Sequence, residues 1–283
     1  MSFVVRFFFA PLYFVGFISA SILIVQSNKS ILWFTPLFIT AVFVSFLAER
    51  LLPYEPKWNQ SKKDRLCNLI HALVNEISNG LSVALIPFLA IIPIGFDVWP
   101  SHWSIWLQLL FSIIIADFGI TMAHYFSHKV ALLWRFHSVH HSVKRMYGFN
   151  GLMKHPLHQM FELLAGTAPL LLIEMPIEIG ALLAFSVAIQ LTLQHSNVDM
   201  KIGVFAYIWA VAPGHRHHHI ASKIDGDINF GLFTMIWDHL LGTFVIKRSM
   251  PRDGEIGIEG QPKYPTDYAN QLSEPFRHLR INH

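Results

Sequence analysis

Six apolar segments divide the chain, and each is close to the length that a helix needs to cross the hydrocarbon core of a membrane. A spanning helix needs about 20 predominantly apolar residues, and the segments cover residues 7–25, 31–48, 79–99, 105–122, 157–173 and 177–194. Of the 283 residues, 53% are hydrophobic and only 14% are charged, which excludes an ordinary soluble domain. The sequence therefore predicts an all-α, polytopic membrane helical protein.

The connections between these segments predict which helix ends share one side of the membrane. Residues 49–78 are polar and contain Lys and Arg, so the positive-inside rule assigns them to the cytoplasm. Residues 97–103 lack Lys and Arg, whereas residues 174–178 carry two acids. The last two segments either span the membrane or form a shallow re-entrant hairpin. Both arrangements bring the histidine-rich parts of the chain to the cytoplasmic face.

The chain is expected to form one membrane-embedded domain over residues 1–246, with a polar cytoplasmic tail over 247–283 that wraps over the site in extended form. Its net charge of +3 is small and spread in short clusters, which excludes a nucleic-acid partner and fits loops facing an anionic leaflet. Cys67 is the one cysteine. Any metal must therefore be held by nitrogen and oxygen ligands rather than thiolates.

Histidines recur at helical spacing in three motifs. The first is HxxxH and the other two are HxxHH, formed by His124 and His128, by His137, His140 and His141, and by His215, His218 and His219. Positions i, i+3 and i+4 converge on one helical face. A lone histidine on an apolar face is usually a core residue, but eight in repeated motifs indicate a metal site. Eight imidazoles exceed the four to six ligands of one ion, which favours two ions.

Several acids and amides accompany these motifs. Asp117 lies in the same helical stripe as His124, and an acid in an apolar helix is costly. It is the candidate acceptor for a hydrogen bond that orients a ligating histidine, and pairing for purely structural reasons is the alternative. Glu162, seven residues after His155, is expected to be a helix-surface acid, and a carboxylate near the site is the alternative. Asn229 and Asp238 are expected to fix the loop beneath the last histidine motif.

These motifs, in this order, resemble the fatty acid hydroxylase superfamily, also called the sterol desaturase family, and especially its bacterial membrane branch. The resemblance covers residues 117–244 closely and is carried by Asp117…His124-Tyr-Phe-Ser-His128, Leu133-Trp134-Arg135-Phe136-His137-Ser138-Val139-His140-His141, Asn150…His155-Pro156, Gln194-His195-Ser196-Asn197, His215-Arg216…His218-His219, Asn229-Phe230-Gly231 and Trp237-Asp238…Gly242-Thr243.

The resemblance implies two iron ions at the cytoplasmic surface that activate O2, although zinc can occupy such a site. The reaction would hydroxylate or desaturate an unactivated C–H bond of a sterol, fatty acyl or related lipid. By position, the ligand roles fall on the eight motif histidines, with His155 and His195 completing or flanking the site. His158 and His217 lie where the family pattern demands no histidine. The location implied is the bacterial inner membrane.

The same chemistry is supported by elementary considerations. Imidazole-bound iron supplies redox chemistry that zinc lacks, and a buried lipid chain needs an apolar cavity that opens toward the metals. The sequence contains no Gly-rich dinucleotide fingerprint, haem-attachment pattern or cysteine cluster, so a separate reductase or electron carrier is predicted. A zinc-dependent membrane hydrolase and a membrane metal carrier remain as alternatives.

Overall fold

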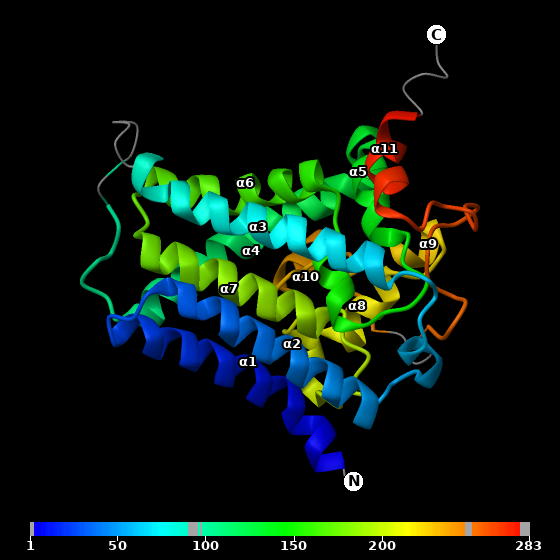
Figure 1. Cartoon of the computed structure of the whole chain (residues 1–283), viewed down its shortest axis with the longest axis horizontal. Coiled ribbons are helices and arrows are strands. Elements are labelled where there is room, and N and C mark those ends of the chain that lie inside the picture. The colour runs from blue at the N-terminus through cyan, green and yellow to red at the C-terminus, as the bar shows by residue number, and fades with distance from the viewer. Residues whose placement is uncertain (1–2, 90–95, 97, 247–250, 278–283) are drawn as a thin grey trace.

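Six long helices lie side by side and several short helices gather at one end of them, as Figure 1 shows. The computed structural model describes residues 3–89, 96, 98–246 and 251–277, and within these ranges it is all-helical, with isolated β-bridges but no strands. The long helices are α1 (Phe3–Gln26), α2 (Phe34–Leu51), α3 (Arg65–Leu89), α4 (Ile105–Lys129), α6 (Pro156–Leu172) and α7 (Ile177–Gln194). The short ones are α5 (Ala131–His141), α8 (Ala212–His218), α9 (Lys223–Gly226), α10 (Ile236–Leu241) and α11 (Tyr268–Arg277).

Five helices have the length and the apolar composition needed to cross a membrane, which confirms the predicted polytopic architecture. They are Phe3–Gln26, Ile31–Leu51, Arg65–Ile86, Ile105–Lys129 and Ile177–Gln194. Helix α6 has 17 residues, so it is about 25 Å long, slightly short of a bilayer core of about 30 Å. The carbonyl of Leu172 at its end accepts a hydrogen bond from the amide of Phe96 at 2.7 Å. Phe96 lies in the connection before α4, and the histidines lie at the other end of α4. The α6–α7 turn therefore lies at the end of the bundle opposite the histidines.

Helix α3 begins within the stretch that was expected to be a polar loop, and this prediction is wrong for residues 65–78. Three polar side chains of this part of α3, those of Asn68, His71 and Asn75, are buried against the protein instead of facing water. Asn75 donates to the carbonyls of Leu152 and Lys154, at 2.9 and 3.0 Å. His71 binds the Lys154 carbonyl at 3.0 Å. The apolar segment expected over residues 79–99 lies partly outside the described residues, at 90–95 and 97.

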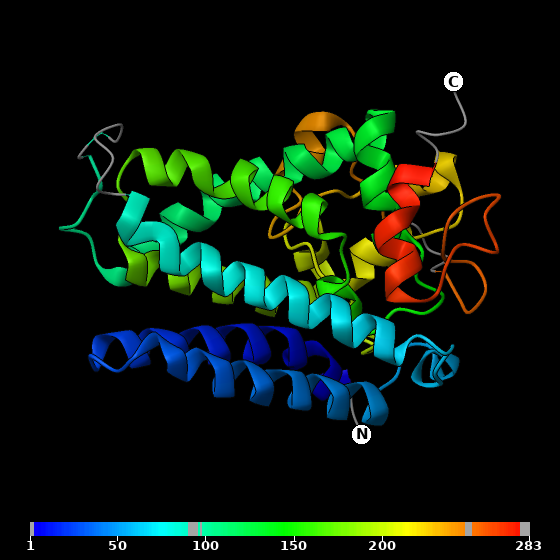
Figure 2. The same cartoon turned by 45° about the horizontal axis from the view of Figure 1, so that its top comes forward.

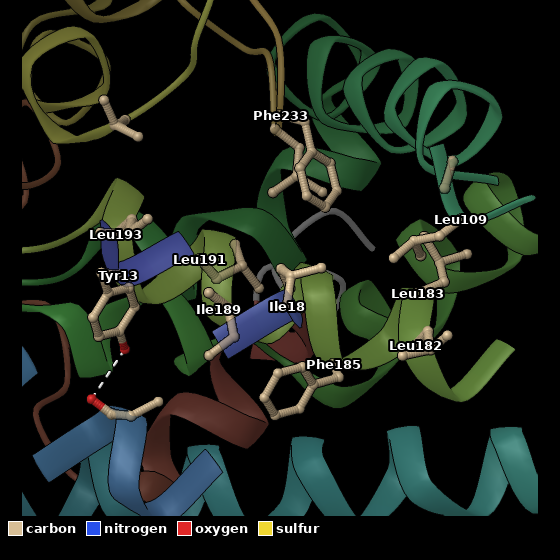
Figure 3. Packing of buried hydrophobic residues seen from close by; sticks show 14 of the residues in the cluster. Tyr13, Ile18, Leu109, Leu182, Leu183, Phe185, Ile189, Leu191, Leu193 and Phe233 are labelled. Atoms are coloured by element: carbon tan, nitrogen blue, oxygen red, sulfur yellow. Dashed lines mark hydrogen bonds between the residues drawn. The ribbon is translucent and has the colours of Figure 1, made fainter. Parts of the chain in front are cut away.

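Helix α7 forms the centre of the bundle. Of the span Ile177–Gln194, 78% is buried, and Leu182, Phe185 and Ile189 lie there in a core cluster that also contains Tyr13 and Ile18 of α1 (Figure 3). The hydroxyl of Tyr13 in α1 donates to the carbonyl of Ala41 in α2 at 3.0 Å and so joins the amino-terminal hairpin. A helix that is apolar on every side is expected in such a buried position or facing lipid.

Glycines allow α4 and α6 to approach closely. A Cβ atom placed on Gly119 would lie 2.0 Å from the carbonyl oxygen of Ala165, and one on Gly166 would lie 2.8 Å from a carbon of Ile120. Small residues permit such contact between the backbones of membrane helices. The close packing holds the histidine-bearing end of α4 beside the first turns of α6.

Residues 251–277 pack over the histidine end of the bundle, beside α5 and α9 (Figure 2). The amide of Gly257 donates to the carbonyl of His219 at 3.1 Å, and the hydroxyl of Tyr264 lies 3.1 Å from that of Ser138. The predicted wrap over the site is present, but residues 268–277 form helix α11 rather than extended chain. Gln271 of this helix is buried and binds His71 at 2.8 Å.

Candidate metal centre

Nine histidines form two adjacent groups at this end of the bundle. Within each group the candidate ligand nitrogens lie within 4.8 Å of one another. The first group consists of His124, His128, His137, His141 and His218, and the second of His140, His195, His215 and His219. All eight motif histidines are included, together with His195. Four helix ends thus bring together side chains from well-separated parts of the sequence.

The two HxxHH motifs divide between the groups in opposite ways. In α5, His137 and His141 join the first group and His140 joins the second. At α8, His215 and the C-cap residue His219 join the second group, and His218 joins the first. A pair at i, i+4 lies nearly in line along a helix, whereas the residue at i+3 is rotated away. Each motif presents three imidazoles, as predicted, and it divides them between the two groups.

Hydrogen bonds to Nδ1 fix the ring orientation of five histidines. A carbonyl or carboxylate oxygen accepts from each Nδ1–H, so Nε2 carries the free lone pair. The pairs are His124 with Phe230 O at 2.9 Å, His128 with Asp227 Oδ1 at 2.8 Å, His140 with Met153 O at 2.9 Å, His195 with Leu191 O at 3.0 Å and His218 with Ile228 O at 2.8 Å. This is the arrangement that ligating histidines usually show.

The Nε2 atoms then face one another without a proton between them. His124 and His218 bring theirs to 2.9 Å in the first group, and His195 brings its Nε2 to 3.1 Å from that of His140 in the second. Two nitrogens bound at about 2.0–2.1 Å to one ion lie roughly 3 Å apart. Opposed lone pairs repel each other unless a cation lies between them. The donor set therefore fits a metal ion in each group.

Burial keeps these imidazoles neutral, which is the form that binds metal. Removal from water lowers the pKa of His195 to about 3 and holds the pKa values of His137, His140 and His215 well below the ordinary range. Neighbouring histidines lower the pKa of the last three further. Because none of these rings must lose a proton at neutral pH, a metal ion would meet no competition from protonation.

Asp117 acts through a loop rather than by contacting a histidine. Its carboxylate accepts hydrogen bonds from the amide of Phe233 at 2.7 Å, from Thr234 and from the indole of Trp237 at 2.9 Å. These donors occupy both carboxylate oxygens. The prediction that Asp117 binds a ligating histidine directly is therefore wrong. The loop that Asp117 holds includes Phe230, whose carbonyl orients His124.

Asp238 supports the same loop from the other side. It accepts from the amides of Phe230 and Gly231, both at 2.7 Å. Asn229 donates to the carbonyl of Gly214, next to His215, at 3.0 Å. The prediction that Asn229 and Asp238 fix the loop beneath the last histidine motif is confirmed.

His155 lies outside both groups. Its Nδ1 accepts from the amide of Leu157 at 3.2 Å and caps α6, and its Nε2 donates to the carbonyl of Leu272 in α11 at 3.1 Å. Both ring nitrogens are therefore engaged, and no lone pair is left for a metal. Its neighbour Pro156 at the first position of α6 is typical of a helix start.

His158 and Glu162 lie beside the first group; His158 was not expected there, and for Glu162 a place near the site was the less favoured alternative. His158 is buried at 4.5 Å between ring centroids from His137, and its Nε2 lies 2.8 Å from the hydroxyl of Ser127. Glu162 is buried, not on the helix surface as expected, and forms an ion pair with Lys154. The i, i+4 spacing of His158 and Glu162 on α6 is a sequence signal that pairs the two residues.

An apolar cavity of about 260 Å³ leads away from this site between α3, α4, α6 and α7. Glu162 and Lys154 line it near the histidines, and Met175 and Gly180 line its other end. An apolar cavity was expected from the sequence, and its lining reaches Glu162 and Lys154 but includes none of the histidines of the two groups. A separate opening of about 160 Å³ reaches His128, His141 and His218 from the side of the tail, between Trp134 and residues 257–261.

The sequence of the chain matches the family model "Fatty acid hydroxylase" over residues 109–243. It belongs to the fatty acid hydroxylase superfamily, as the motif order predicted.

Ornithine lipid hydroxylase OlsE of Rhizobium tropici is 32% identical over 267 residues, which cover 89% of this chain and 78% of OlsE. Alkylglycerol monooxygenases of Danio rerio and Homo sapiens are 29% and 27% identical over 146 residues, about half of this chain and about a third of theirs. No solved structure matches the chain. The relatives are lipid hydroxylases and monooxygenases, which places the chain among oxidoreductases.

Proposed function

We propose that the protein is an O2-dependent hydroxylase of a membrane lipid and that it uses two iron ions, one in each histidine group. The observation that carries this proposal is the pair of groups, whose Nε2 lone pairs converge while their Nδ1 atoms are held by oxygen acceptors. The names of the relatives favour hydroxylation over desaturation and make an ornithine lipid the first substrate to test.

His124, His128, His137, His141 and His218 would hold one ion, and His140, His195, His215 and His219 would hold the other. Iron bound by imidazole supplies the redox chemistry for activating O2 and oxidising an alkyl C–H bond. The protein contributes the fixed rings, because Phe230, Asp227, Met153 and Ile228 accept from Nδ1 and prevent the imidazoles from turning.

The balanced reaction converts a C–H bond and one O2 into a C–OH group and one water, and it consumes two protons and two electrons. Those electrons are proposed to come from a separate reductase or electron carrier, since the sequence lacks a nucleotide or haem motif. The opening at Trp134 gives such a partner an approach to the first group, because His128 lines it and Trp134 is 5.0 Å from His128 between ring centroids.

The histidine end of the bundle is proposed to face the cytoplasm of a bacterial cell. Lys57, Lys62 and Lys63 lie in the connection between α2 and α3 at that end. Retention of basic connections on the cytoplasmic side is the general rule for membrane helices. This orientation would bring the site to soluble electron carriers.

The proposal is tested on protein from iron-supplied cells. We expect two irons per chain, and lipids that gain one oxygen in cells with the chain but not with a His124→Ala, His218→Ala double variant. A loss of two hydrogens would indicate desaturation instead. One tightly bound zinc together with ester or amide hydrolysis would replace the proposal with a zinc hydrolase, and purified chain that hydroxylates lipid with NADPH alone would remove the need for a partner.

A further inference from the structure

The cavity between α3, α4, α6 and α7 is polar at one end and apolar at the other. We propose that it holds one acyl chain with its ester or amide linkage at the histidine end and its methyl group near Gly180. Oxygen would then enter a carbon at a fixed distance from the linkage. This inference rests on the proposed lipid hydroxylation.

The polar end is built from side chains of α3 and α6. Gln159 donates to the amide oxygen of Asn79 at 3.0 Å, which joins the two helices across the cavity wall. Lys154 and Glu162 line the same end and form a buried ion pair. These groups can exchange hydrogen bonds with a carbonyl or an amide of a lipid, because each carries more donor or acceptor sites than one contact uses.

This end of the cavity adjoins both histidine groups. Glu162 lies 3.8 Å from Nδ1 of His158, which packs on His137 of the first group. Leu191 lines the cavity, and its carbonyl accepts from Nδ1 of His195 in the second group. A carbon held here would be the part of the chain nearest to the metal positions.

The other end offers a lipid carbonyl no comparable donor among the described residues. Ile86, Met175 and Leu183 line it with hydrocarbon. The Thr167 hydroxyl donates within its own helix, to the carbonyl of Leu163 at 2.7 Å. A carbonyl placed at this end would lose its hydrogen bonds to water without replacement, which is costly. A methyl end loses nothing there, so the gradient selects one direction for the chain.

The chain can enter from the side, between α3 and α6. Leu85, Met160 and Leu164 line the cavity and yet are 54%, 52% and 53% exposed. In a membrane their exposed faces meet lipid tails. A lipid could therefore slide its chain in laterally while its headgroup stays near the interface at the histidine end.

The cavity also has the shape for a single chain. The α6 residues that line it run from Gln159 to Leu171, a helical length of about 18 Å. Small residues of α7 keep the cavity open, because Gly180 and Ala184 present almost no side chain to it. A Cβ atom on Gly180 would already lie 2.5 Å from Ile86.

The test uses cells that express the full chain and are fed fatty acids differing by two carbons in length. Tandem mass spectrometry then locates the hydroxyl group in the product lipids. We expect its position, counted from the carbonyl, to stay the same as the chain lengthens. A position that is constant when counted from the methyl end would overturn the inference. The absence of any oxygenated lipid would instead overturn the proposed function itself.

Two variants sharpen the test. Gln159→Leu removes the polar bridge and should lower the product by about two- to tenfold and spread the hydroxyl over neighbouring carbons. Gln26→Leu, the same change at an exposed position at the end of α1, should change neither. Ala184→Phe should shorten the longest chain accepted and leave the hydroxyl position unchanged. Product from Gln159→Leu that matches the parent in amount and position would contradict the assignment.

Discussion

His124 and His218 are 94 positions apart in the sequence, and their Nε2 atoms are 2.9 Å apart in the structure. Helices α4 and α8 carry them, and the contact closes the first histidine group between the membrane bundle and the segment that follows α7. Two lone pairs at this distance are stabilised by a shared cation. Metal binding and the docking of α8 on α4 should therefore be coupled.

The first prediction concerns this pair. His218→Ala should remove one ligand of the first group and lower metal affinity by more than about 100-fold, since changes in the residues around ligands alone cost 10–100-fold. Metal content after dialysis against a weak chelator measures the effect. Retention of both ions at full affinity would show that His218 is not a ligand.

His155 provides the matched control for the histidine substitutions. His155→Asn keeps an acceptor at the cap of α6, and asparagine is among the preferred residues there. We therefore expect the variant to bind the same amount of metal as the parent and to unfold at nearly the same temperature. If metal is lost while the protein stays folded, His155 belongs to the centre after all.

Asp117→Asn should act on the metal indirectly. The amide group of asparagine would point a donor at donors from residues 233–237, and leaving buried donors unpaired costs about 1–3 kcal/mol. The loop would then release the Phe230 carbonyl that orients His124. We expect a lower unfolding temperature together with about 10–100-fold weaker metal binding. A stable variant with unchanged metal affinity would show that the loop does not depend on this carboxylate.

The α4–α6 contact predicts opposite outcomes for two glycines. Gly119→Ala would place a carbon 2.0 Å from the Ala165 carbonyl and should destabilise the protein by about 1–3 kcal/mol. Gly80→Ala meets nothing within 4 Å and replaces a helical glycine, so it should stabilise α3 by roughly 0.5–1 kcal/mol. Thermal unfolding in detergent compares the two, and equal effects would mean that α4 and α6 are not in close contact.

Acid should destabilise the metal-free protein. The folded-state pKa of His195 is lowered by burial to about 3, and that of His158 to about 4, whereas an unfolded histidine titrates near 6.5. Between these values the unfolded chain binds more protons, so these residues contribute stability above about pH 6.5 that is lost as the pH falls toward the folded values. Unfolding temperatures of chelated protein should fall from pH 7 to pH 5, and a flat profile would contradict buried, neutral rings.

The sequence predicted the membrane helices and the motif histidines because both follow from local spacing. Length and hydropathy identify a spanning helix without reference to its neighbours. The i, i+4 pairs likewise stay together in one group. The distribution of His140 and His218 to the opposite groups could not be predicted, since it depends on how α5 and α8 face each other.

The errors about burial concern polar residues that have partners in other elements. Asn75 and His71 were assigned to a solvated loop, yet their partners at Lys154 and Gln271 make burial favourable. Glu162 was assigned to a helix surface, and its partner Lys154 is eight positions away across a turn. Charge and polarity indicate exposure only when no tertiary partner exists.

The segment that covers the histidines, residues 251–277, follows all nine of them in the chain. Because synthesis proceeds from the amino terminus, every imidazole leaves the ribosome before its cover does. His128, His141 and His218 line the opening beside residues 257–261, and they are therefore synthesised before the residues that narrow that opening.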